Sequence, residues 1–280
     1  MTKRIRICLD AGHYGKYNRS PVVKAYYESD MTWELHLLLK KHLESYGFEV
    51  ITTRSDKAKD LSLSKRGKTA RGCDLFLSLH SNATGGNNGN EAVDRVDIYA
   101  PLSGKGHDIA RKLANRIVEV MGTKQGGNVK TRKGSTGGEY YGVIRGAVAV
   151  GVPGLLVEHS FHTCTRSAKW LLDKGNLDKL ARAEAQVLAE HYGMTAKAEP
   201  EASGKTESAQ AFPYLVKVTA GTLNVRKGPG TNYGARTQIK RGGVYTIVDE
   251  KLNGTTRWGL LKSYSRDRDG WIALNYTKKV

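Results

Sequence analysis

The feature that most constrains the fold is the alternation of strand-like and helix-like segments along residues 1–195. Residues 4–10 (RIRICLD) and 48–54 (FEVITTR) have the apolar and β-branched character of strands. Between them, apolar residues recur at helical spacing, at Met31, Leu35, Leu38, Leu39 and Leu43. This order predicts a βαβ unit, in which a helix joins two parallel strands.

The alternation continues to the end of this region. Further strands are predicted at residues 75–80, 92–100 and 154–160, and further helices at 61–72, 105–122 and 176–193. Repeated alternation of this kind is typical of sheets whose strands run in the same direction and are joined by crossover helices. We therefore predict an α/β domain with a mainly parallel sheet and helices on both faces.

A change of composition marks a second domain. Residues 196–211 (AKAEPEASGKTESAQA) are small and polar, which is typical of a linker. Residues 212–280 then show short alternating stretches, such as VYTIVDE, that are broken by Gly, Pro and Asn. We predict one domain at 1–195, a linker at 196–211 and a small all-β barrel at 212–280.

The net charge indicates the kind of partner. The chain has 45 Lys and Arg against 27 Asp and Glu, a formal charge of +18. This exceeds the roughly 2 to 8 charges that solubility requires of a small domain. The excess favours a polyanionic partner, such as nucleic acid, anionic lipid or anionic cell-wall polymer. A surface tuned for solubility is the alternative.

Other patterns exclude a membrane span. The longest apolar runs, such as Val148–Val157, are well short of the roughly 20 residues that cross a bilayer, so we expect no membrane insertion. The N-terminal MTKRIRICLDAGH lacks the apolar core of a secretion signal, so we expect synthesis in the cytoplasm without a signal peptide. The odd set of Cys8, Cys73 and Cys164 contains no CxxC pair, and we expect reduced thiols.

Polar side chains follow several of the predicted strands. His13 follows the first strand, His80 ends LFLSLH and Glu158 ends GLLVE. Because ligands in such sheets bind outside the carboxyl ends of the strands, we expect these side chains to lie together. Glu28 lies just ahead of the first long helix, whose N-terminus returns to the same edge after a right-handed crossover.

Each of these residues alone has an ordinary structural explanation. A histidine at a strand end can be hydrogen-bonded, and a glutamate can stabilise the N-terminus of a helix. Together, however, two imidazoles and two carboxylates form the set that hydrolytic zinc requires. The histidines and one carboxylate hold Zn²⁺, and the second carboxylate serves as a base.

Five stretches resemble the ordered motifs of the zinc-dependent N-acetylmuramoyl-L-alanine amidases of the Amidase_3 type, found in phage endolysins and bacterial autolysins. They are LDAGHYG, ESDMTWEL, LSLSKRGKTA, DLFLSLHSNA and GVPGLLVEHSFHT, within residues 3–193. The resemblance implies that His13, Glu28 and His80 bind zinc and that Glu158 is the catalytic glutamate. The implied reaction is hydrolysis of the amide between N-acetylmuramic acid and L-alanine. In it, zinc polarises the carbonyl and Glu158 passes a proton from water to the leaving amine.

The chain departs from the family pattern at EHSFHT, where the family more often has Gly and a small or apolar residue. His159 and His162 are therefore interpreted as local packing, with a substrate contact or an alternative zinc ligand left open. Asp10 is either a residue that orients His13 or a turn-forming aspartate. Cys164 has no assigned role. Residues 84–91 and 127–142 have the content of rims that hold a glycopeptide, or of loops without a task.

The C-terminal region carries a second resemblance. LNVRKGPGTNYG, Trp258 and DGWIALNY resemble the bacterial SH3 (SH3b) domains that attach lytic enzymes to cell walls. The resemblance implies an SH3-like barrel that binds the wall. Tyr233, Trp258, Trp271 and Tyr276 either line a peptide groove or fill the core.

Three classes of function remain. The first is a zinc amidase with a wall-binding domain, most simply a phage or prophage endolysin that acts on the cell wall after release. The second is a non-catalytic wall or polyanion binder on an amidase scaffold, and the third is a nucleic-acid-binding protein, indicated by charge alone. We expect the first, with peptidoglycan and anionic wall polymers rather than nucleic acid as partners, because the zinc and base residues are complete. The sequence leaves open the host, the stem peptide and the oligomeric state.

Overall fold

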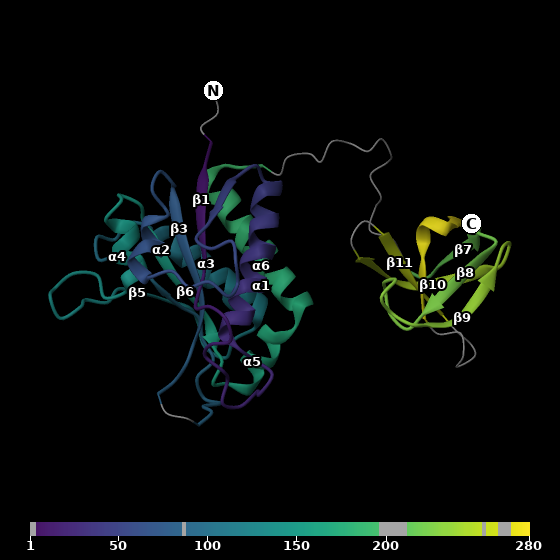
Figure 1. Cartoon of the computed structure of the whole chain (residues 1–280), viewed down its shortest axis with the longest axis horizontal. Helices are drawn as coiled ribbons and strands as arrows, with labels where there is room; N and C mark the ends of the chain where they lie inside the picture. The colour runs from purple at the N-terminus through teal and green to yellow at the C-terminus, as the bar shows by residue number, and fades with distance from the viewer. Residues whose placement is uncertain (1–3, 86–87, 196–211, 254–255, 263–269) are drawn as a thin grey trace. The chain divides into compact units, whose positions relative to one another are not determined.

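A six-stranded sheet organises the N-terminal region in the computed structural model (Figure 1). The structure describes residues 4–85, 88–195, 212–253, 256–262 and 270–280. The predicted linker at 196–211 lies outside these residues. The chain divides into two units, Met1–Glu201 and Ala202–Val280.

The elements of the first unit alternate as the sequence predicts. Its strands are β1 (Arg6–Ala11), β2 (Glu49–Thr52), β3 (Leu75–Asn82), β4 (Asp97–Tyr99), β5 (Asn128–Lys130) and β6 (Gly154–Phe161). Its helices are α1 (Glu28–Ser45), α2 (Leu63–Lys68), α3 (His107–Met121), α4 (Gly142–Val148), α5 (Thr165–Leu172) and α6 (Lys174–Tyr192). The strand order is β2-β1-β3-β6-β4-β5, and all neighbours are parallel except β4 and β6. The prediction of a mainly parallel α/β sheet is confirmed.

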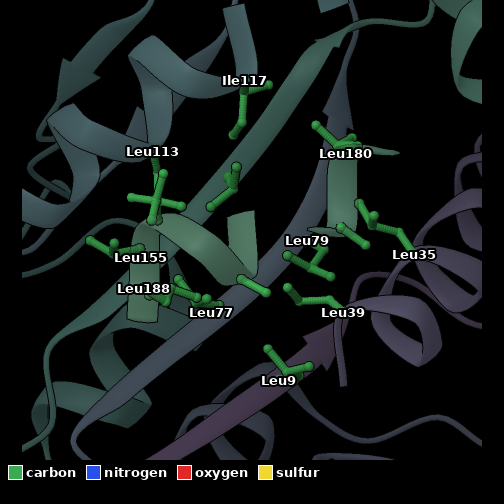
Figure 2. Close-up of a cluster of buried hydrophobic side chains, with 14 of the residues drawn as sticks. Leu9, Leu35, Leu39, Leu77, Leu79, Leu113, Ile117, Leu155, Leu180 and Leu188 are labelled. Atoms are coloured by element: carbon green, nitrogen blue, oxygen red, sulfur yellow. The ribbon is translucent and has the colours of Figure 1, made fainter. Parts of the chain in front are cut away.

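Apolar side chains alternate along the inner strands and fill a core on each face. The larger core lies between the sheet and α1, α3 and α6, and Figure 2 shows leucines from these helices and from β1, β3 and β6 meeting there. The smaller core, built around Cys8, Phe76 and Leu156, lies on the side of α2 and α4. Helices therefore cover both faces of the sheet (Figure 1).

The helices α2 and α4 touch through their backbones. A Cβ atom on Gly146 would lie 2.5 Å from the carbonyl oxygen of Ser64, and one on Gly67 would overlap the carbonyl oxygen of Val143. The glycines of α4, Gly142 and Gly146, lower its helix propensity, and for this reason no helix was predicted there. They also permit the close approach that buries Val143 and Ile144 against the sheet.

The predicted strand at 92–100 is wrong in extent, because only Asp97–Tyr99 join the sheet. The preceding Asp94 is buried, and its carboxylate accepts hydrogen bonds from Ser160, Ser167 and Arg166. Those side-chain bonds tie residue 94 to the end of β6 and to α5, and its backbone does not join a strand. The strand β5 and the helix α5 were also not predicted, since they span only three and eight residues.

The second unit is an antiparallel sheet with strand order β13-β7-β10-β11-β12-β8-β9. Its strands are β7 (Tyr214–Val218), β8 (Thr222–Arg226), β9 (Ala235–Lys240), β10 (Val244–Asn253), β11 (Thr256–Leu261), β12 (Trp271–Ala273) and β13 (Thr277–Lys279). The all-β prediction is confirmed. Of the four aromatic residues, Trp258 is buried, Tyr233 and Tyr276 are exposed, and Trp271 is partly buried.

None of the described helices has the length and apolar composition that a membrane span requires.

Candidate metal and catalytic site

The site is centred on Glu28, the first residue of α1. Its carboxylate is buried, with Oε1 2.8 Å from Nδ1 of His80 and Oε2 3.1 Å from Nε2 of His13. The backbone amide of Ser81 donates to Oε1 at 3.0 Å, and the side-chain amide of Asn18 donates to Oε2. Burial alone would raise the pKa of Glu28, but the bonds from His13 and His80 hold that pKa below its usual value.

The donor atoms of His13, Glu28 and His80 all lie within 4.8 Å of one another. Two neutral imidazoles and a carboxylate are the donor set of hydrolytic zinc sites, in which a fourth position serves water or substrate. The residues present therefore fit a Zn²⁺ ion. The structure brings together the three residues that the resemblance implied as ligands, and their role remains a prediction.

Hydrogen bonds from two arginines hold the backbone around His13. His13 has a left-handed conformation, with φ of 60°, which a residue with a Cβ atom adopts rarely. The buried Arg66 donates to the carbonyl oxygens of His13 at 3.0 Å and Ala11 at 2.8 Å. Arg54 donates to the same carbonyl of Ala11 at 2.8 Å. Two guanidinium groups thus fix the turn that directs His13 toward Glu28.

The ring of His80 is held on its other side by a hydrogen-bonded chain. Nε2 of His80 lies 3.1 Å from the hydroxyl of Ser78, and that hydroxyl donates to Asp10 at 2.7 Å. Partners of this kind orient a metal-binding imidazole. Asp10 also accepts from Thr53 and Arg66, so it supports His80 through Ser78 and reaches the backbone of His13 through Arg66. The alternative that Asp10 bonds the His13 ring directly is not what the structure shows.

Glu158 lies beside this cluster on the neighbouring strand. It pairs in register with His80 across β3 and β6, on the same face of the sheet, and with Asp97 of β4. Its Oε2 atom is shielded from solvent and has no hydrogen-bond partner among the described residues. Burial, followed by the charges of Glu28 and Asp97, raises the pKa of Glu158 well above its usual value. An unpartnered carboxylate at this place suits a group that exchanges a proton.

The two additional histidines occupy different environments. His159 is buried with Nδ1 2.9 Å from the carbonyl of His80 and Nε2 2.6 Å from Glu184 of α6. Burial lowers the pKa of His159, but the Glu184 charge raises it above its usual value overall. This is the local packing that was expected. His162 instead lies near the site, with Nδ1 4.0 Å from Oε2 of Glu28.

Cys164 is a buried free thiol whose Sγ lies 3.5 Å from Glu91. Among the described residues, no hydrogen bond joins Cys164 to His13, Glu28 or His80. Of the predicted rim at residues 84–91, positions 86 and 87 lie outside the described residues.

Sequence reasoning missed the residues that support the cluster, chiefly Asn18, Ser78, Ser81, Arg54 and Arg66. Their only sequence signal is position: Ser78 and Ser81 flank His80 on β3, and Asn18 lies in the segment between β1 and α1. The direction of a hydrogen bond depends on packing between distant elements, so this signal could not assign their partners.

Comparisons with known proteins show a family and a set of solved structures that the first unit resembles. Residues 7–190 match the Amidase_3 family, described as N-acetylmuramoyl-L-alanine amidase. No curated protein sequence matches the chain with significance.

Among solved structures, Cwp6 from Clostridium difficile is similar, with 24% identity and a TM-score of 0.57 over 68% of this chain and 30% of Cwp6. The catalytic domain of the amidase CwlV from Bacillus (Paenibacillus) polymyxa has 23% identity and a TM-score of 0.54, over 68% of this chain and 99% of that domain. The amidase AmiC2 of Nostoc punctiforme has 21% identity and a TM-score of 0.58, over 69% of this chain and 99% of AmiC2. At these identities the likeness shows a shared fold.

Proposed function

The chain belongs to the Amidase_3 family of N-acetylmuramoyl-L-alanine amidases, and from this premise we propose that it hydrolyses peptidoglycan by a zinc-dependent reaction in which Glu158 is the base. The observation that carries the proposal is the convergence of His13, Glu28 and His80 within 4.8 Å, next to the strand that presents Glu158. The bond cut is the amide between N-acetylmuramic acid and L-alanine.

His13, Glu28 and His80 would hold the ion. When bound, zinc supplies a Lewis acid that increases the electrophilicity of the scissile carbonyl and the acidity of water. Asp10 and Ser78 hold the ring of His80, and Arg66 holds the backbone of His13, so the ligands require little rearrangement to take up the metal.

We assign both proton transfers of the reaction to Glu158. Its carboxylate accepts a proton from the attacking water and then donates it to the amine of L-alanine as the C–N bond breaks. A raised pKa suits both steps, because a carboxyl group whose pKa lies nearer to neutrality is a stronger base and can also return the proton.

The C-terminal unit extends this proposal. We infer that residues 212–280 form an SH3b-type domain that holds the enzyme on the wall, and that the chain acts as a phage or prophage endolysin. It would be made in the cytoplasm and reach the wall after release. The formal charge of +18 supports attraction to anionic wall polymers.

A non-catalytic wall binder is disfavoured by the complete set of candidate ligands and base. Charge alone indicates nucleic-acid binding, and the comparisons do not point to it.

The decisive experiment is digestion of purified peptidoglycan followed by mass analysis of the products. An amidase releases stem peptides with a free L-alanine amine and leaves glycan strands with intact lactyl groups. The activity should disappear with a chelator and return with zinc. Cleavage at a glycosidic bond or within the peptide would overturn the proposed function.

A further inference from the structure

A cavity lies beside the candidate site, and two of the residues that line it, Asn18 and His162, also approach Glu28. It has a volume of about 400 Å³, and its walls include Asn18, Arg19, Ser20, Lys24, His162 and Thr163. We name it the Arg19 pocket. It is formed where the segment between β1 and α1 folds against the residues that follow β3 and β6.

The Arg19 pocket carries two cationic side chains without acidic partners. No carboxylate lies within ion-pair distance of Arg19 or Lys24 among the described residues, and none of the described residues lining the pocket is Asp or Glu. Arg19 is nevertheless positioned, because its Nε donates to the carbonyl of Lys24 at 2.8 Å and its guanidinium lies 5.6 Å from the ring centre of Tyr27. Within the part of the chain that the structure describes, the other guanidinium N–H groups of Arg19 make no hydrogen bond, so they can bind an anion.

His162 supplies a different kind of group. Its side chain is 1% exposed and stacks on Tyr26, with ring centres 5.7 Å apart. Nδ1 lies 2.9 Å from the hydroxyl oxygen and 3.0 Å from the carbonyl oxygen of Ser81. Because the carbonyl oxygen can only accept and the hydroxyl oxygen can also accept, we assign the hydrogen to Nδ1. Nε2 is then the acceptor, and it has no hydrogen-bond partner among the described residues. The wall thus combines cations with one buried acceptor.

The pocket and the candidate site share a wall. Asn18 donates to Oε2 of Glu28, and Nδ1 of His162 lies 4.0 Å from the same oxygen. A group bound in the pocket is therefore only a few atoms from the reacting centre. This combination suits a peptide, which offers N–H donors to His162 and a carboxylate to Arg19 and Lys24, better than a phosphodiester, which has no N–H group.

We propose that the Arg19 pocket receives the stem peptide and selects a free carboxylate on the residue that follows L-alanine. This inference rests on the proposed amidase function and adds a specificity to it. Arg19 and Lys24 are the residues that distinguish a carboxylate from a carboxamide at that position, because only the carboxylate is negatively charged.

The test uses two soluble N-acetylmuramoyl-L-alanyl-D-glutamyl substrates whose γ-carboxyl group is capped as a methylamide. They differ only at the α-carboxyl group of that residue, which is a free carboxylate in the first and a carboxamide in the second. The wild-type protein should cut the first with the higher kcat/KM. Arg19→Gln combined with Lys24→Gln should lower kcat/KM for the carboxylate substrate about tenfold, mainly through KM. The same change should leave the carboxamide substrate almost unaffected.

A matched control removes two exposed charges elsewhere. Lys41→Gln with Lys179→Gln changes α1 and α6 by the same total charge, and the preference between the substrates should not change. Equal loss on both substrates in the Arg19 and Lys24 variant, or no loss, overturns the assignment.

If the proposed amidase function is wrong, the result differs from both of these outcomes, because the wild type would then cut neither substrate. Calorimetric binding of the dipeptide L-alanyl-D-glutamate, with its γ-carboxyl group capped as a methylamide, still tests the pocket in that case. The wild type should bind it more tightly than the Arg19 and Lys24 variant, and equal affinity for the two proteins overturns the proposal.

Discussion

His80 and Glu158 occupy paired positions on the parallel strands β3 and β6, at the carboxyl edge of the sheet. His80 contacts Glu28 and belongs to the cluster of candidate zinc ligands, whereas Glu158 lies outside that cluster with one oxygen unpartnered among the described residues. The register of one strand pair thus places the proposed metal-binding residue beside the proposed proton-transfer residue.

Replacing His80 by Ala should remove zinc and activity together, because only Glu28 and His13 would remain as ligands. Elemental analysis of purified protein should give about one zinc per wild-type chain, from a His₂Glu set, and much less for the variant. His191→Ala, on the last turn of α6, should keep the metal. A metal-free wild-type protein with full activity would contradict the zinc assignment.

Glu158→Gln tests the base directly. Glutamine keeps the shape of the side chain but cannot accept a proton, so zinc should be retained while kcat falls by about 10² or more. Glu28→Gln should instead lower zinc content. If Glu158→Gln loses zinc and Glu28→Gln does not, the two glutamates have exchanged roles.

The pH dependence of kcat/KM should report Glu158. The base must be ionised, so activity should be present above the pKa of Glu158 and lost as the pH falls through it. Since burial and the charges of Glu28 and Asp97 raise that pKa, the acid limb should lie above the roughly 4.3 of an ordinary glutamate. Asp97→Asn removes one of the charges and should move the limb to lower pH. A limb that does not move would mean that another group controls it.

Gly12→Ala should damage the site more than the fold. A Cβ atom at this position would lie 2.6 Å from Nε2 of His80 and 2.6 Å from the carbonyl oxygen of Leu79, so the ring and the strand end must shift. We expect weaker zinc binding, measured by competition with a chelator, together with a loss of stability. Gly138→Ala has no atom within 4 Å of the added carbon and is the control. Unchanged zinc affinity in Gly12→Ala would show that the ring tolerates displacement.

Truncation near Ala198 should leave a folded amidase with its zinc site, because both cores of the first unit lie within residues 5–194. Small muropeptides should be cut at nearly the wild-type rate, while intact walls should be bound less tightly, since a tethered second module acts through effective concentration. Wall binding should also weaken with salt, as the Debye length falls from ~10 Å at 0.1 M to ~3 Å at 1 M. Pelleting of each isolated part with wall fragments checks this. A barrel that stays in solution at low salt would contradict anchoring.

The sequence was sufficient for the long periodic elements and for the residues that meet at the sheet edge. The apolar pattern of α1 and the buried runs of β3 and β6 are strong local signals, and the strand ends then place His13, His80 and Glu158 together. It was insufficient for α4, where glycines that serve contact with α2 lower the helix signal. It also could not distinguish His159 from His162, because neighbours in sequence face different partners, Glu184 and Ser81, only after the segment beyond β6 has folded.

The order of the strands also determines how fast different parts of the site should exchange amide hydrogens with solvent. β3 and β6 are inner strands with a hydrogen-bonded neighbour on each side, so their amides should exchange with solvent only when the whole sheet opens. His13 and Asn18 instead belong to the connection between β1 and α1, whose backbone is partly outside the ladder. Removing the ion should therefore accelerate amide exchange first in residues 12–27, while the amides around His80 and Glu158 remain protected. The half of the site on the inner strands would then remain ordered without the ion, and the stability of the His13 half would depend more on the ion.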